Sequence, residues 1–237
     1  YAILDEQRAH VVTVQAAALK AEQWNAVRQI TWKVEDYLDL QGHFTDRQTI
    51  IQAGLVAARA SNARYDEAEF LNRHGIACVA LGETHRAVEL YKQALAIDRK
   101  IGDLNGEGIT LGNLGNAYAA LGETHRAVEL YKQALAIDRE IGDRRREGID
   151  LGCLGLAYAD LGETHRAIDY HQQDLTIRRE IGDRRGEGNA LGNLGLAYAD
   201  IGETRRAIDL YEKQLDIVRK IGDRRGEGDA QGNLGNA

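Results

Sequence analysis

The chain of 237 residues contains no proline, no methionine and only two cysteines, Cys78 and Cys153. Because natural reading frames begin with methionine, we expect the chain to be a segment of a longer protein. The two cysteines lie 75 positions apart, which is too sparse for a disulfide framework. We therefore expect reduced thiols and a cytoplasmic location.

Long apolar runs and excess positive charge are also missing. The chain has no stretch of ~18 apolar residues and no signal-peptide pattern, so we expect no membrane partner. Its formal net charge is −7 at pH 7, opposite in sign to most nucleic-acid-binding domains, so we expect no nucleic-acid partner. No G-x-x-x-x-G-K-[ST] phosphate loop occurs, and the residues suggest no catalytic triad. The sequence predicts no catalytic residue, no cofactor and no metal site.

What the chain does contain is a repeat of 40 residues. Leu71, Leu111, Leu151 and Leu191 each begin one copy. The string LGETHRA recurs at 81–87, 121–127 and 161–167, and IGD recurs at 101, 141, 181 and 221. Residues 31–70 follow the same frame in degenerate form, and residues 231–237 begin a further copy. A fixed period of this length is typical of a solenoid.

Each repeat is interrupted twice by a pattern that ends one helix and begins the next. Gly122 precedes Glu123 and Thr124, and Gly142 precedes Asp143. Glycine favours the left-handed conformation that follows a helix, and threonine or aspartate favours the N-cap of the next one. The stretches between are rich in Ala, Leu, Glu, Arg and Gln and show no strand pattern. We therefore predict an all-α fold, a right-handed α-solenoid of antiparallel helix pairs.

The first helix of each pair divides into three stripes, since successive residues turn by about 100°. In the repeat that begins at Leu111 the core stripe is Leu111, Leu114, Tyr118 and Leu121. A second stripe holds only glycines: Gly108, Gly112 and Gly115. Each interior glycine costs about 1 kcal/mol relative to alanine. We predict that these glycines permit close approach of a neighbouring helix; the alternatives are backbone exposed to a ligand and drift copied by duplication.

These small and large positions resemble those of the tetratricopeptide repeat. The matching residues are Leu114, Gly115 and Tyr118 on the first helix and Ala127, Tyr131 and Ala134 on the second. Three features depart from the family: the period exceeds its usual length of about 34, Arg139 replaces a proline, and Asp174 and Gln214 replace a small residue. The resemblance covers residues 71–237 strongly and 31–70 weakly. It implies a tetratricopeptide repeat superhelix that binds proteins or peptides and is not an enzyme.

The 40-residue form, with its strings LGNLG and GDRRGEG, resembles kinesin-light-chain-type repeats and those of bacterial STAND (NB-ARC-like) signalling ATPases. Residues 4–47 resemble the helical segment that joins the ATPase to the repeats in those bacterial proteins. We expect helices at 4–21 and 23–41, a helical cap or linker at 1–42, and a solenoid at 43–237. Its repeats would be 31–70 (degenerate), 71–110, 111–150, 151–190, 191–230 and a partial 231–237.

The resemblance implies a ligand-sensing domain of such an ATPase. The alternative is a stand-alone scaffold or adaptor that associates end to end through its open C-terminal repeat.

The third stripe of the first helices is the candidate binding site, because in this fold the first helices line the concave surface. Asparagine both donates and accepts hydrogen bonds, so a row of asparagines can bind the backbone of an extended peptide. Leucines there would take apolar side chains, and aspartates would favour a basic segment. The alternative is a solvated polar groove. The candidate residues are Arg73, Asn113, Asn116, Leu156, Asp160, Asn189, Asn193, Leu196, Asp200, Asn233 and Asn236.

A row of arginines marks the start of the first helices. It consists of Arg144, Arg145, Arg146, Arg184, Arg185, Arg224 and Arg225. Phosphate groups could bind there, but we favour solvated side chains that pair with nearby Asp and Glu.

Overall fold

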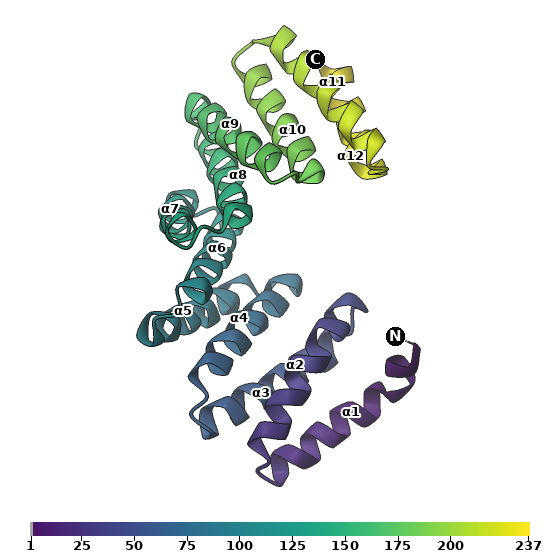
Figure 1. Ribbon diagram of the computed structural model, residues 1–237, viewed down its shortest axis with the longest axis vertical. Helices are drawn as coiled ribbons and strands as arrows, with labels where there is room; N and C mark the ends of the chain where they lie inside the picture. The colour runs from purple at the N-terminus through teal and green to yellow at the C-terminus, as the bar shows by residue number, and fades with distance from the viewer. Residues whose placement is uncertain (1) are drawn as a thin grey trace. The chain divides into compact units, whose positions relative to one another are not determined.

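In a computed structural model, residues 2–237 are described, with side chains from Gln7 onward. These residues form twelve α-helices (Figure 1). In chain order they are α1 (Ala2–Lys20), α2 (Trp24–Leu40), α3 (Phe44–Ala60), α4 (Arg64–Ala80), α5 (Thr84–Ile101), α6 (Leu104–Ala120), α7 (Thr124–Ile141), α8 (Arg144–Asp160), α9 (Thr164–Glu180), α10 (Arg184–Asp200), α11 (Thr204–Lys220) and α12 (Arg224–Asn236).

The chain divides into two compact units, the first ending at Ala117 and the second covering Tyr118–Ala237. In the first unit α2 pairs with α3 and α4 with α5, while α1 packs on α2 and α3. In the second unit α8 pairs with α9 and α10 with α11, while α7 packs on α8 and α12 on α11. Paired helices run antiparallel (Figure 1), which confirms the predicted all-α class and its succession of helix pairs.

The turns between helices recur every 20 residues. Glycines with a left-handed φ of 70–78° occupy every such position from Gly82 to Gly222, and Gly42 has a φ of 72°. Two earlier turns have the same conformation without glycine: Glu22 has a φ of 55° and Asn62 a φ of 53°. The helix spacing of the repeats therefore extends through residues 20–60, where the sequence similarity is weak. The first two helices lie within three residues of the predicted ranges.

Of the two predicted types of helix N-cap, aspartate is present and threonine is not. Asp143 is an N-cap, and its carboxylate accepts a hydrogen bond from the N–H of Arg146 at 3.0 Å. The expectation of a threonine N-cap is wrong, because the N-cap of α7 is Glu123 and Thr124 is the first helical residue. The Glu123 side chain makes no capping bond and pairs instead with the guanidinium of Arg126.

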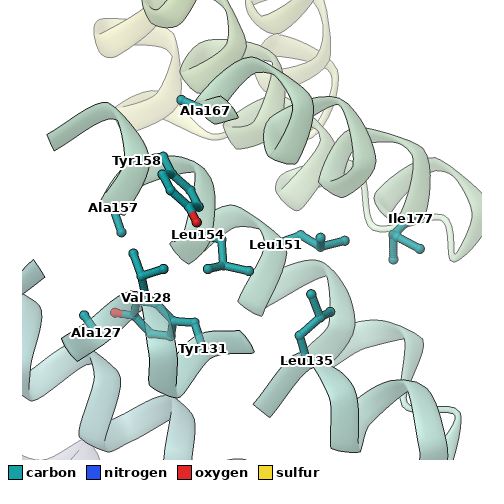
Figure 2. Close-up of a cluster of buried hydrophobic side chains, with 10 residues drawn as sticks. All are labelled: Ala127, Val128, Tyr131, Leu135, Leu151, Leu154, Ala157, Tyr158, Ala167 and Ile177. Atoms are coloured by element: carbon teal, nitrogen blue, oxygen red, sulfur yellow. The ribbon is translucent and has the colours of Figure 1, made fainter. Parts of the chain in front are cut away.

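The core of the second unit is built around α8. Leu151, Leu154 and Ala157 of this helix lie between side chains of α7 and side chains of α9 (Figure 2). On the α7 side the cluster contains Val128, Tyr131 and Leu135, and on the α9 side Ala167 and Ile177.

The glycine stripe lets a ring of the paired helix pack against the backbone. A Cβ placed on Gly155 would lie 2.3 Å from His171 Cε1, and one on Gly195 would lie 2.4 Å from Tyr211 Cε1. In the first unit, a Cβ on Gly75 would lie 2.4 Å from Tyr91 Cε1. Real Cβ atoms do not approach a ring this closely, so the prediction that the stripe permits close helix approach is confirmed at these positions.

Ion pairs join each helix pair to the next. Glu147, whose side chain is 5% exposed, accepts a hydrogen bond from Arg139 Nε at 2.8 Å and also pairs with Arg144. The arrangement recurs at Glu187, which is bound by Arg179 and Arg184. The predicted pairing of arginines at helix starts is thus confirmed for Arg144 and Arg184.

A buried carboxyl pair connects α7 to α8. Asp138 and Asp150 are 1% and 5% exposed, and Arg146 Nε lies 3.1 Å from Asp138 Oδ1. Burial, reinforced by the charge of Asp138, raises the pKa of Asp150 to about 8. Both carboxyl groups therefore have a raised pKa, because each is buried beside the other.

Replacing Asp150 by asparagine is expected to stabilise the protein at alkaline pH. The native state keeps a proton that the unfolded chain releases above its ordinary pKa of 3.8, so stability falls as pH rises from about 4 to about 8. Asparagine cannot ionise. The free energy of unfolding of Asp150→Asn should therefore exceed that of the wild type by about 1 kcal/mol or more near pH 8 and equal it near pH 4. Urea unfolding followed by circular dichroism across this range tests it. The exposed Asp209→Asn is the control, and parallel pH profiles for wild type and Asp150→Asn would refute the argument.

Candidate functional site

In the first unit, two of the three candidate residues hold neighbouring helices together. Arg73 of α4 pairs with Glu35 and with Asp36 at 2.6 Å on α2, and its guanidinium lies 5.1 Å from the centre of a Trp32 ring. The Asn113 side-chain nitrogen on α6 donates to the Asn72 oxygen on α4 at 2.8 Å.

The third candidate, Asn116, is exposed. The helix-packing role of Asn72 was missed, although it stands where the other repeats carry the glycines Gly112, Gly152 and Gly192.

In the second unit, five candidates from two helices line one cavity of about 590 Å³. They are Asn189, Asn193 and Leu196 of α10 with Asn233 and Asn236 of α12. We call it the amide cavity. Gly192, Gln214, Gly228, Asp229 and Gly232 complete its lining. The candidates Leu156, Asp160 and Asp200 lie outside that lining.

Gln214 of α11 contributes to the amide cavity because a glycine faces it. A Cβ on Gly192 would lie 2.7 Å from Gln214 Nε2, so any larger residue there would displace the carboxamide. Gln214 is 5% exposed, and its Oε1 has no partner among the described residues. In the sequence, Gln214 stood out only as a departure from the family. The signal that could have revealed its place in the cavity is that it lies opposite a glycine of the paired helix. The preceding repeat has the same arrangement, since a Cβ on Gly152 would lie 3.1 Å from Asp174 Oδ2.

The lining of the amide cavity offers many hydrogen-bonding groups and no positive charge. Five carboxamides and one carboxylate, Asp229, line it, and no lysine or arginine does. Carboxamides can satisfy both the N–H and the C=O groups of a peptide backbone. The volume is within the range of cavities that hold small ligands or short peptide segments.

The two cysteines and His171 are not poised for nucleophilic chemistry. Burial raises the pKa of the Cys78 and Cys153 thiols to about 11, so both are protonated at neutral pH. Burial lowers the pKa of His171 to about 4. Among the side chains that the structure describes, from Gln7 to Ala237, no three of His, Cys, Asp or Glu are grouped to hold a metal ion. No described helix has the length and apolar character of a membrane span.

Comparison with known proteins agrees with this architecture. The model of the tetratricopeptide repeat family matches residues 56–140 and 149–220. No curated protein matches the chain.

Solved structures with similar folds include three informative cases. BtubC from P. vanneervenii has a TM-score of 0.78 and 18% identity over 91% of this chain and 92% of that one. Aspartyl phosphate phosphatase F from Bacillus subtilis has a TM-score of 0.79 and 13% identity over 88% of this chain and 55% of that one. A STAND protein with a tetratricopeptide repeat sensor from Pyrococcus horikoshii has a TM-score of 0.76 and 20% identity over 88% of this chain and 33% of that one. At these identities the likeness shows the fold alone.

Proposed function

Because the chain belongs to the tetratricopeptide repeat family, we propose that it is a non-catalytic module that binds an extended peptide segment of a partner protein. The amide cavity is the observation that carries this proposal, since it gathers carboxamides from two successive first helices and the helix between them. Leu196, which is 46% exposed, offers an apolar contact at its edge. The carboxylate of Asp229, with Asp160 and Asp200 on the same stripe, favours a neutral or basic segment.

Removing carboxamides from the amide cavity is expected to weaken peptide binding about tenfold or more. Each lost hydrogen bond costs about 0.5–1.5 kcal/mol, so the double variant Asn193→Ala, Asn233→Ala should lose about 2 kcal/mol. Peptides selected by display against the wild-type chain would serve as probes in isothermal titration. Gln231→Ala is the matched control, since Gln231 is exposed on the same helix as Asn233 but does not line the cavity. Equal affinities for the wild type and the double variant would reject the site.

The finer form of the proposal is that this module senses a ligand for a STAND-type ATPase. Its support is the likeness to a STAND protein whose repeats are described as a sensor, of which this chain spans about a third. A peptide that binds one arrangement of the repeats better than another would shift the population of active ATPase. The gene should then encode a G-x-x-x-x-G-K-[ST] loop upstream of Tyr1, and deleting the repeats should change ATP hydrolysis. A gene without that loop would contradict the sensor role.

A scaffold that associates with itself is the second candidate, and one observation favours it. On α12, a Cβ at Gly228, Gly232 or Gly235 would meet no atom of the described residues within 4 Å, whereas α11 covers the same stripe on α10. A further helix packed there, either of this protein or of another copy, would cover this stripe as α11 covers that of α10. Light scattering over a range of concentrations should show a rising mass; a constant monomer mass would contradict self-association.

A further inference from the structure

A second cavity of about 590 Å³ lies in the second unit, on helices other than those of the amide cavity. We call it the basic cavity. Its lining comes from α7, α8 and α9 and consists of Lys132, Leu135, Ala136, Arg139, Tyr158, Arg166, Asp169, Tyr170 and Gln173. None of these residues belongs to the candidate stripe of the first helices.

Aromatic rings and cations meet in the basic cavity. The rings of Tyr158 and Tyr170 stack with centres 5.3 Å apart and planes 4° from parallel. The Arg166 guanidinium lies 5.3 Å, and Lys132 Nζ 5.9 Å, from the centre of the Tyr158 ring. Tyr170 is particular to this repeat, because the same position is leucine in the three other clear repeats (Leu90, Leu130 and Leu210) and isoleucine in the degenerate one.

Positive charge exceeds negative charge in this lining. Three cations face the single carboxylate of Asp169. Lys132 pairs at 3.2 Å with Glu129 and Arg166 at 2.7 Å with Glu163, but both acids lie outside the lining, and such exposed pairs contribute little. Arg139 donates through Nε to Glu147 and through Nη2 to Gln173. Since a guanidinium has five N–H donors, Arg139 and Arg166 keep donors for a ligand.

A neighbouring cavity in the same unit has a different lining and more carboxylates than cations. It lies between α9 and α11 and contains three cations but four carboxylates: Glu187, Asp209, Glu212 and Asp216. Only Arg179, Asp209 and Lys213 of this lining stand 40 residues after lining residues of the basic cavity, so the two cavities take in different parts of their repeats. The excess of cations over carboxylates in its lining makes the basic cavity the better match for an acidic ligand.

The spacing of the cations defines the ligand further. Lys132 and Arg139 lie two helical turns apart on α7, which places their attachment points about 10 Å apart. Leu135 and Ala136 lie between them, and Tyr170 contributes an apolar ring face. We propose that the basic cavity binds an acidic peptide segment of a partner protein, with two carboxylates about 10 Å apart and an apolar side chain between them.

Binding of a synthetic helical peptide tests this directly. The probe carries two glutamates two turns apart with a leucine midway, and the control peptide carries glutamines instead. Fluorescence polarisation with the full chain at physiological salt gives the dissociation constants. Exposed ion pairs contribute up to about 1 kcal/mol each, so Lys132→Gln, Arg139→Gln and Arg166→Gln should each weaken binding about three- to fivefold. Tyr170→Leu, which installs the residue of the other repeats, should weaken it about threefold.

A matched variant separates binding from stability. Arg179→Gln removes the pair with Glu187, just as Arg139→Gln removes the pair with Glu147, so both should destabilise the fold equally. Only Arg139→Gln should weaken binding of the probe peptide. Equal loss for both variants, equal binding of the glutamine peptide, or displacement of the probe by an equal concentration of inorganic pyrophosphate would overturn the proposal.

Discussion

Replacing Glu35 by alanine is expected to lower the free energy of unfolding of the first unit by about 3 kcal/mol. Glu35 on α2 is 1% exposed, and it accepts a hydrogen bond from Arg47 Nε on α3 at 2.6 Å. It also pairs with Arg73 on α4. One buried carboxylate thus joins three helices.

The cost arises from the cation that is left behind. Arg47 is itself only 3% exposed, so without Glu35 its charge stays buried, with Asp39 as its remaining carboxylate partner. Removing one partner of a buried pair costs about 3–5 kcal/mol, and Asp39 keeps the effect at the lower end. Arg73 retains Asp36 and contributes less to the loss.

Tryptophan fluorescence in urea measures this effect in the relevant unit, because both tryptophans, Trp24 and Trp32, lie before Ala117. The control is Glu89→Ala. Glu89 is exposed and pairs with Lys92 at 2.9 Å in the same unit, so its loss should be below about 0.5 kcal/mol. Similar losses for Glu35→Ala and Glu89→Ala would show that the buried network is not what stabilises the unit.

The second large effect is expected for Gly195→Ala, which should destabilise the second unit by about 2 kcal/mol. Helix propensity alone predicts a gain of about 1 kcal/mol. The added methyl group would lie 2.4 Å from a ring carbon of Tyr211, which is itself 2% exposed and held by α10 and α11. Overpacking of this kind costs about 1–3 kcal/mol or more, so the clash exceeds the gain in propensity.

The same substitution on α12 should have the opposite sign. Gly228 occupies the same stripe, but no atom in the described part of the chain lies within 4 Å of a Cβ placed there. Gly228→Ala should therefore leave stability unchanged or raise it by up to about 1 kcal/mol. Far-UV circular dichroism in urea gives both values. In a double-mutant cycle, Gly195→Ala should destabilise the Tyr211→Ala background much less than it destabilises the wild type. Changes in stability of the same sign for Gly195→Ala and Gly228→Ala would contradict the packing argument.

Local features of the sequence predicted the helices well. The glycines from Gly82 to Gly222 mark turns because they favour a left-handed φ, and the 100° spacing correctly grouped the core residues Leu111 and Leu114. The same spacing placed Asn189 and Asn193 on the face of α10 that borders the amide cavity. These properties depend on residues within one or two helical turns.

Neighbouring helices decide which side chains on that face are left for a ligand. Asn113 looks equivalent to Asn193 in the sequence, yet Asn72 from 41 residues earlier binds it. Arg73 is held by Glu35 and Asp36, which belong to a segment without a clear repeat. A periodic pattern shows where a side chain lies on its own helix, but its partner comes from a neighbouring helix whose residue differs from copy to copy.

The sequence alone therefore determined the helical class, the turn positions, the paired-helix repeat and the face on which the asparagines lie, because each follows from backbone preferences over short distances. Only the tertiary structure decided that Gly192 makes room for Gln214, that Tyr158 and Tyr170 stack beside three cations, and that Asp138 and Asp150 are buried as a pair. These contacts join side chains of different helices. Their energies depend on burial and distance, and near-identical copies of a repeat do not reveal either.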